Sequence, residues 1–465
     1  MNDDRIPSGD PRLDAVLGGG LLANSIAVLM GQPGSGKTTL AEQYLFGNAT
    51  PQRPGIYLST VSEPLEKLLR YGQRLSFFEP GAVGSSVFFD DLGTVLHDEG
   101  LAGVDERIGA LVRQHRPGML VIDSFKALAP YAADHGEYRD FLYRLAATLS
   151  AFPVTTLWVG EYPASTILDE PEFAVADAIV SLSVERLGHH HKRLLDVVKL
   201  RGSDFISGRH AYRITSDGIR VFPRLADSAG LPPTPPVTER ISSGVATLDT
   251  MLHEGYWSGA STMVAGPSGT GKTLLGLHFV FAGADRGEHG IVASFQEDTA
   301  MLTRVCEGFG WKLDRPEVTV LHRSPVDLLV DEWVYELLET AERTGARRIL
   351  IDSLGDLAIA AGDEIRFREF IYSLLTRTAQ AGISVLMTQE TEDLYNITRL
   401  AQHGISHVSD NVVVLQYLRG DSEIKRAVTV LKSRASIHDP AIVQFTITDD
   451  GFALGAAFTA HQDLQ

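Results

Sequence analysis

Short, nearly continuous apolar runs alternate with longer helical stretches along the first half of the chain. The runs are rich in β-branched residues, and most begin or end at a polar residue or a glycine. This pattern is typical of parallel strands buried on both faces of a sheet, with helices as the crossovers. It predicts strands at Ser25–Met30, Gly55–Thr60, Ser86–Asp91, Met119–Asp123 and Val154–Val159.

The second half of the chain repeats this alternation. It predicts strands at Ser261–Ala265, Gly290–Phe295, Val318–His322, Arg348–Asp352 and Ile383–Thr388. Each half therefore has the pattern of an α/β fold with a mostly parallel sheet flanked by helices.

Each half ends in runs that alternate around a turn. In the first half these runs are Asp177–Glu185 and Leu194–Leu200. Strands joined by a tight turn pair in the antiparallel direction. We therefore expect an antiparallel C-terminal extension of each sheet.

The two halves also match residue by residue. The offset is 235 residues between Ile6-Pro7-Ser8-Gly9 and Ile241-Ser242-Ser243-Gly244, and 233 between Lys199-Leu200-Arg201 and Lys432-Ser433-Arg434. Small insertions and deletions in loops explain the drift. The chain is thus two tandem copies of a unit of roughly 225 residues, far longer than the period of a solenoid repeat.

A proline-rich segment separates the copies. Four of the five residues from Pro232 to Pro236 are prolines, which favours extended polyproline geometry and a semi-rigid spacer. We predict a first domain at residues 1–226, a linker at 227–240, a second domain at 241–458 and a short tail at 459–465.

The charge of the chain bears on its partners. Its 41 basic and 59 acidic residues give a formal net charge of −18, and it contains no run of basic residues that would gather a positive patch. Such a surface repels nucleic acid and anionic lipid. We therefore expect neither nucleic acid nor a membrane as a partner.

Other absences from the sequence point to the cytoplasm. No apolar run reaches the roughly 18 residues of a membrane span. The N-terminus lacks the basic and apolar regions of a signal peptide. The only cysteine is Cys306, which excludes a disulfide framework.

The motif G-x-x-x-x-G-K-[ST] occurs once in each copy, directly after a predicted strand. Its glycines let consecutive backbone N–H groups surround phosphate oxygens, its lysine reaches the terminal phosphates, and its hydroxyl ligates Mg²⁺. The motif predicts an ATP site in each copy. The predicted binding residues are Gly31, Gly34, Ser35, Gly36, Lys37, Thr38 and Thr39 in the first, and Gly266, Gly269, Thr270, Gly271, Lys272, Thr273 and Leu274 in the second.

An acidic residue ends a predicted strand downstream of each loop. These residues are Asp123 and Asp352, each followed by a serine. A parallel sheet would place the carboxylate beside the phosphate loop, where it can hold Mg²⁺ together with Thr38 or Thr273. The alternative is that the position only caps the following helix, a role that Ser124 or Ser353 could fill equally.

These motifs together resemble the KaiC family of RecA-like P-loop ATPases, over nearly the whole chain. Apart from the doubled loop, the resemblance rests on the Ile-x-Ser-Gly-x-x-x-Leu-Asp opening of each copy and on several short motifs. The motifs are Lys199-Leu200-Arg201-Gly202-Ser203, Leu415-Gln416-Tyr417, Arg426-Ala427 and His438-Asp439-x-Ala441-Ile442.

The resemblance implies a two-tiered homohexameric ring with ATP bound between neighbouring subunits. It also implies that Lys199, Arg201, Lys432 and Arg434 reach the γ-phosphate held by the adjacent subunit. A cation supplied across an interface in this way stabilises charge in the transition state. The resemblance identifies no signalling partner beyond the chain itself.

The catalytic carboxylates depart from the family pattern, which has a Glu-Glu pair just after the second strand of each domain. The first copy has Val61-Ser62 at those positions, and Glu63 lies one place late. The second copy has Gln296 and Glu297. Glutamine can orient water but cannot accept its proton. We therefore expect ATP binding at both sites, weak hydrolysis in the first copy and slow hydrolysis in the second through Glu297.

The autophosphorylation sites of the family, a neighbouring Ser and Thr, correspond to Ser406 and His407. Serine autokinase activity could therefore persist only at Ser406, as a single phosphoserine. The family's longer C-terminal tail, where a stimulating partner docks, corresponds here only to Thr459–Gln465. We therefore do not expect a timing oscillator that uses that partner.

Two other functions fit the same fold. A DNA-dependent recombinase or helicase would need basic, mobile DNA-binding loops, and the net charge of −18 argues against it. A non-enzymatic signalling scaffold would use ATP only to hold its ring together, and the incomplete Glu pairs favour it. A turnover measurement separates the scaffold from the ATPase.

Overall fold

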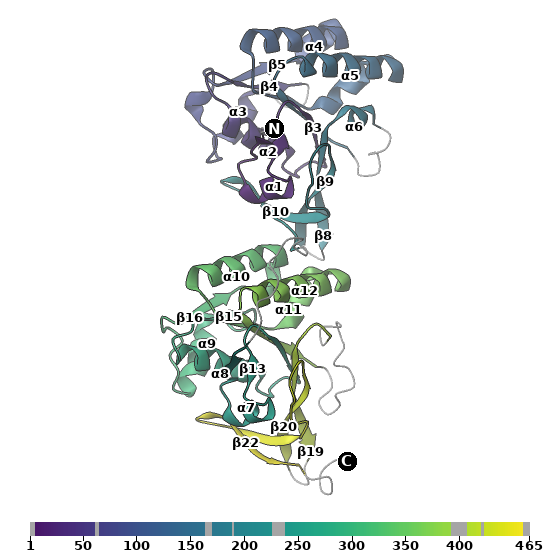
Figure 1. Cartoon of the computed structure of the whole chain (residues 1–465). Coiled ribbons are helices and arrows are strands. Elements are labelled where there is room, and N and C mark those ends of the chain that lie inside the picture. Colours follow the sequence, from purple (N-terminus) through teal and green to yellow (C-terminus); the bar gives the residue numbers. More distant parts are fainter. Residues whose placement is uncertain are drawn as a thin grey trace. The chain divides into compact units, whose positions relative to one another are not determined.

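The computed structural model describes residues 5–60, 65–162, 170–187, 190–225, 238–391, 407–419 and 423–458. The chain divides into two compact units, Met1–Arg224 and Leu225–Gln465 (Figure 1). Each unit contains a nine-stranded sheet and a separate two-stranded ribbon. Most of the predicted linker and the whole of the predicted tail lie outside the described residues, so the domain boundaries stay predictions.

The first unit has its large sheet in the order β11-β10-β9-β8-β3-β7-β6-β4-β5. The strands are β3 Ile26–Gly31, β4 Gly55–Ser59, β5 Val87–Asp91, β6 Met119–Asp123, β7 Thr155–Gly160, β8 Ala178–Leu187, β9 His190–Leu200, β10 Arg209–Thr215 and β11 Gly218–Phe222, with β1 Arg5–Ile6 and β2 Leu21–Leu22 in the ribbon. The helices are α1 Pro11–Val16, α2 Lys37–Asn48, α3 Leu65–Gly72, α4 Gly93–His115, α5 His135–Ser150 and α6 Pro171–Val175, with 3₁₀ turns η1 Pro80–Ala82 and η2 Phe125–Tyr131.

The second unit repeats this order as β16-β15-β17-β18-β14-β19-β20-β21-β22, read from the opposite edge. Its strands are β14 Ser261–Gly266, β15 Gly290–Ser294, β16 Val318–His322, β17 Arg348–Asp352, β18 Ser384–Glu390, β19 Asn411–Arg419, β20 Ile424–Ser433, β21 Val443–Thr448 and β22 Gly451–Ala457, with β12 Arg240–Ile241 and β13 Tyr256–Trp257 in the ribbon. The helical segments are α7 Ala246–Met251, α8 Lys272–Ala284, α9 Thr299–Gly308, η4 Pro325–Asp327, α10 Val330–Thr344, α11 Leu354–Ala361 and α12 Glu364–Gln380.

The predicted fold class, two RecA-like units with mostly parallel sheets, is confirmed. Strands β6, β16 and β17 have the predicted bounds, and the other predicted parallel strands shift by one or two residues. The predicted antiparallel C-terminal extension is confirmed, since β8 is antiparallel to β9, and β8 joins it to the parallel part of the sheet by pairing in parallel with β3. None of the described helices combines the length and the apolar character needed to cross a membrane.

Alternation along the central strands fills a core on each face of the sheet. On β3, Val28 and Met30 pack with α4 and α5, whereas Ala27 and Leu29 pack with α1 and α2. Figure 1 shows α4 and α5 on the other side of this sheet from α2. The second unit has the same two cores. A strand between two apolar layers must be apolar at every position, and this explains the continuous runs in the sequence.

One equivalent position in α2 and α8 is filled differently in the two units. In the second unit the Phe452 backbone N–H donates to His278 Nε2 at 3.2 Å, whereas in the first the Ile219 N–H donates to Gln43 Oε1 at 2.8 Å. The histidine must be neutral to accept this bond. Burial lowers the pKa of His278 to about 4.

His278 therefore makes the stability of the second unit dependent on pH. The unfolded chain binds more protons than the folded chain between pH 6.5 and about 4, so stability is lost as the pH falls through that range. Allowing for partial exposure, we expect His278→Gln to remove about 2 kcal/mol of this loss. Urea unfolding of the wild type and the variant at pH 7 and pH 5 measures the difference. Equal losses in the two proteins would contradict the assignment.

Candidate nucleotide sites

Each predicted phosphate loop joins the end of a central strand to the start of a helix. Strand β3 ends at Gly31 and α2 begins at Lys37, and β14 and α8 are joined in the same way. The residue before each helix, Gly36 or Gly271, has a φ of 91° or 99°, which only glycine adopts without strain. The unpaired N–H groups at such a helix start form an anion site.

The first glycine of each loop is required for a second reason. A Cβ on Gly31 would lie 2.1 Å from the Leu182 carbonyl oxygen, and one on Gly266 would lie 2.3 Å from that of Leu415. The neighbouring strand therefore approaches the loop too closely for any side chain. The absence of a side chain at Gly31 and Gly266 therefore allows each loop to pack directly against the neighbouring strand.

The two loop lysines are largely buried, with each ammonium held inside its own loop. Lys37 Nζ donates to the Gln32 carbonyl at 3.0 Å, and Lys272 Nζ donates to the Pro267 carbonyl at 2.9 Å. Burial lowers the pKa of both lysines, while nearby carboxylates act in the opposite direction. The phosphates of a nucleotide would add further negative charge beside each buried ammonium and so stabilise its charged form.

The loop threonine and the strand-end aspartate meet in both units. Thr38 Oγ1 donates to Asp123 Oδ2 at 2.8 Å, and Thr273 Oγ1 donates to Asp352 Oδ2 at 2.6 Å. The aspartates have different further donors, since Tyr57 from β4 contacts Asp123 and Thr388 from β18 contacts Asp352. A hydroxyl beside a carboxylate is a hard oxygen donor set of the kind Mg²⁺ prefers.

A cavity opens over each loop. The cavity in the first unit has a volume of about 660 Å³, and the cavity in the second about 320 Å³. Gly31, Ser35, Thr39, Gly266 and Thr270 are not among the residues that line them. The predicted residues in the linings are Gly34, Gly36, Lys37, Thr38 and Asp123 in the first, and Gly269, Gly271, Lys272, Thr273, Leu274, Gln296, Glu297 and Asp352 in the second.

Glu297 and Gln296 are predicted catalytic residues that line the cavity of the second unit, and Glu297 is the predicted base. Its Oε2 atom is buried, with no hydrogen-bond partner among the residues that the structure describes. Burial, and then the charge of Asp352, raise the pKa of this carboxyl. A buried carboxylate oxygen without a partner is costly unless a ligand or water meets it. Glu63, with Val61 and Ser62, lies outside the described residues.

Sequence reasoning missed acidic residues at both sites. Glu161 follows β7 and lies 3.9 Å from Lys37 Nζ, and Glu390 lines the equivalent cavity. Glu161 and Glu390 are 229 residues apart, as are Asp123 and Asp352, and this shared offset could have identified them from the sequence. In the second unit Asp356 accepts a hydrogen bond from Gln296, and this residue has no acidic counterpart in the first copy.

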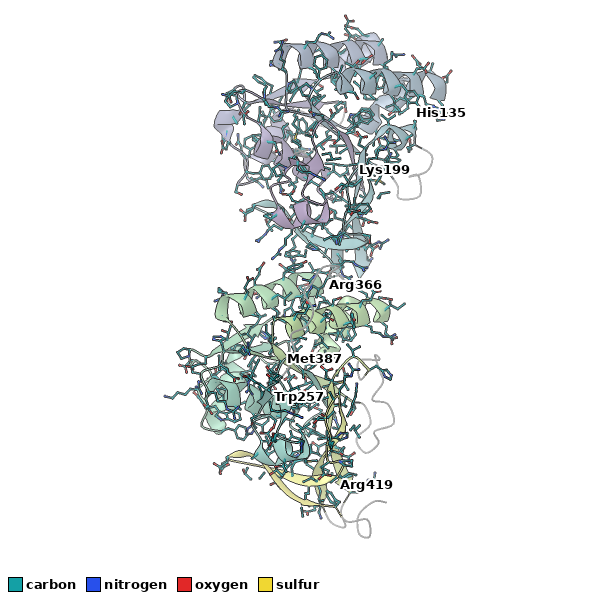
Figure 2. The ribbon with its side chains drawn as sticks, in the orientation of Figure 1. His135, Lys199, Trp257, Arg366, Met387 and Arg419 are labelled. Atoms are coloured by element: carbon teal, nitrogen blue, oxygen red, sulfur yellow. The ribbon has the colours of Figure 1, made fainter. Side chains whose placement is uncertain are left out.

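The predicted cations Lys199, Arg201, Lys432 and Arg434 are held in both units, with equivalent partners for the two arginines and with carbonyls at different positions for the two lysines. Lys199 Nζ donates to the Phe173 carbonyl at 2.9 Å, and Lys432 Nζ donates to that of Ser409 at 2.6 Å. Figure 2 labels Lys199 on β9. Burial, and then the adjacent arginine, lower the pKa of both lysines.

The arginines of these pairs are exposed and loosely held. Arg201 contacts Asp177 and Arg434 contacts Asp410, each at 3.4 Å, and each side chain is 57% exposed. The Arg434 guanidinium also donates to the carbonyl of His407 at 3.3 Å. His407 follows the candidate phosphosite Ser406, which lies outside the described residues.

These cations lie at the opposite end of the sheet from the phosphate loop of their own unit. The Arg201 N–H donates to the Asp177 carbonyl, and the Asp177 N–H donates to that of Ile26, the first residue of β3. The loop starts five residues further along this strand, about 16 Å away. Arg434 has the same relation to β14 through Asp410 and Ser261.

Comparison with known proteins identifies the family. The family described as "ATPase: KaiC" matches residues 6–226 and again residues 241–457. The circadian clock oscillator protein KaiC of Picosynechococcus is 28% identical over 470 residues, covering 97% of this chain and 89% of its own. The circadian clock protein KaiC3 of Synechocystis is 28% identical over 473 residues, covering 98% and 92%. The chain belongs to the KaiC family of P-loop ATPases.

Proposed function

We propose that the chain binds Mg-ATP at both phosphate loops of a homohexameric ring and hydrolyses it slowly, mainly in the second unit. One observation carries this proposal. The cavity of the second unit brings together Lys272, the Thr273–Asp352 pair and the partnerless carboxylate oxygen of Glu297. These are groups suited to bind phosphate, to hold Mg²⁺ and to accept a proton.

Magnesium would be held by Thr38 and Asp123 in the first unit and by Thr273 and Asp352 in the second. When bound, the ion neutralises charge on the β- and γ-phosphates. Groups of the protein itself bind the phosphates. Lys272 contacts the phosphates as a fixed charge, and the start of α8 presents its backbone N–H groups to them.

Hydrolysis in the second unit would use Glu297 as the general base. Its raised pKa brings the carboxyl closer to the pH at which it works, and its free oxygen is available for a water molecule. Water attacks the γ-phosphorus, the bond to the β-phosphate oxygen breaks, and the proton of the water passes to Glu297. In the first unit we assign at most weak hydrolysis to Glu63.

The position of the arginines supports a site shared between subunits. Arg201 and Arg434 lie too far along the sheet to reach the loop of their own unit, yet both are exposed and weakly paired. A neighbouring subunit could present each of them, with Lys199 or Lys432, to a bound γ-phosphate. Both units would then hydrolyse ATP only in an assembled ring.

A mixing experiment tests this assignment. Arg434→Ala chains and Lys272→Ala chains should each be nearly inactive in the second unit, for different reasons. In mixed rings some interfaces combine an intact loop with an intact arginine, so a fraction of the wild-type turnover should return. Rings verified as mixed by native mass spectrometry that recover no activity would contradict action across the interface.

A nucleotide-held signalling scaffold is the second candidate. It is favoured by the replacement of the first carboxylate by Gln296, which leaves the second site with one predicted base. Residual serine autokinase activity would act on Ser406. Both named relatives are circadian clock proteins, and we propose a signalling or clock-related role in the cytoplasm, exerted through a signalling partner.

A further inference from the structure

Asp356 lies in the first turn of α11, beside the catalytic residues of the second unit. Gln296 Nε2 donates to both of its carboxylate oxygens, at 3.2 Å each. The Ser353 hydroxyl donates to Oδ2 at 2.8 Å. Asp356 is only 8% exposed and is not among the residues that line the cavity, whereas Gln296 and Ser353 are. Asp356 can therefore influence the site only through the residues that it contacts, Gln296 and Ser353.

This contact fixes which end of the Gln296 amide faces the nucleotide. A carboxylate offers acceptors only, so the NH₂ group must turn toward Asp356. The carbonyl oxygen Oε1 is then directed away from Asp356. Without this contact the amide could rotate and present a donor in place of an acceptor, because its two ends have nearly the same shape.

We propose that Asp356 is a positioning residue of the second ATP site, which holds Gln296 so that its carbonyl oxygen accepts a hydrogen bond from the attacking water. One proton of the water would point to Gln296 Oε1, and the other would pass to Glu297 as the water attacks. Gln296 would then orient the water, and Glu297 would accept its proton, so that the two residues together replace a Glu pair. This inference rests on the proposed hydrolysis in the second unit.

The first unit provides the natural comparison. At the offset of 229 residues that relates Asp123 to Asp352, the residue matching Asp356 is Ala127. The residue matching Gln296, at the offset of 235 that relates Ser59 to Ser294, is Val61. The amide and the carboxylate that orients it thus occur together in one copy and are both absent from the other.

The proposal is tested by comparing the effect of Asp356→Ala on kcat in the wild-type protein and in a Gln296→Glu variant. Asp356→Ala alone should lower kcat of the whole chain about tenfold, because the nucleophile is no longer oriented. KM for ATP and the nucleotide content should stay unchanged. In a Gln296→Glu background the same Asp356→Ala change should raise kcat severalfold, because it removes a like charge beside the new carboxylate.

A purely structural role for Asp356 predicts a different result. If it only stabilises the start of α11, Asp356→Ala should lower activity and stability in both backgrounds, and that outcome would overturn the proposal. Asp363→Ala is the matched control, since it removes an acidic cap from the start of α12 in the same unit. It should change the urea midpoint without the kcat effect.

Hydrolysis in the second unit and the positioning role of Asp356 can be tested separately. If Glu297→Gln leaves turnover unchanged, hydrolysis is not in the second unit and the proposed function fails. If Glu297→Gln abolishes turnover while Asp356→Ala leaves kcat unchanged in the Gln296 protein, only the positioning role fails. A kcat loss that reverses sign in the Gln296→Glu background supports both.

Discussion

Glu297→Gln should reduce ATP turnover of the chain about a hundredfold or more, the contribution expected of a general base. The substitution keeps the size of the side chain and removes only its ability to accept a proton. Nucleotide binding should be unaffected, since the phosphates are held by the loop and Lys272. Phosphate release under steady-state conditions, together with the nucleotide content of the purified protein, measures both effects.

Glu63→Gln is the matched control in the first copy and should change turnover little. The opposite pattern, a large loss with Glu63→Gln and none with Glu297→Gln, would place the reaction in the first unit. It would mean that a carboxylate one position late in the sequence still reaches the water.

Lys37→Ala and Lys272→Ala should each remove about one nucleotide per chain, because each ammonium is the main positive charge of its loop. Each ammonium is held inside its loop by a backbone carbonyl, so it is already placed for a phosphate. Chromatographic analysis of bound nucleotide after gel filtration gives the count. Lys126→Ala is a control in the first unit, because Lys126 lines the same cavity but is paired with Glu170 at 2.5 Å.

An unchanged nucleotide content in Lys37→Ala would show that the first loop no longer binds nucleotide in the wild type. The same result for Lys272→Ala would remove the basis for hydrolysis in the second unit. Loss of both nucleotides from either single variant would instead indicate that assembly of the ring depends on each site.

Strand positions and the loop residues could be predicted from the sequence because their causes are local. A strand between two helical layers is apolar throughout, as in Met119–Asp123, and a loop glycine with positive φ has no substitute, as at Gly36. The direction of β8 could not be predicted in this way, because its pairing with β3 is set by a partner far away in the sequence.

Asp356, the positioning residue of the second site, could not be predicted from a motif for a related reason. Asp356 has no motif of its own, and it contacts Gln296 only because the sheet brings the ends of β15 and β17 together. The position of Arg201 is similar. Its motif was visible in the sequence, but its distance from the loop of its own unit appears only once the register of β9 against β8 is known.

ATP sites shared between the subunits of a ring are the central feature of the proposed function. Size-exclusion chromatography with light scattering, with and without Mg-ATP, tests this claim most directly. With Mg-ATP the mass should be six times the 50.6 kDa of one chain, and without nucleotide it should fall to smaller species. A Lys37→Ala, Lys272→Ala double variant should stay small under both conditions. A chain that binds ATP at both loops and still elutes with the mass of one chain would contradict the account.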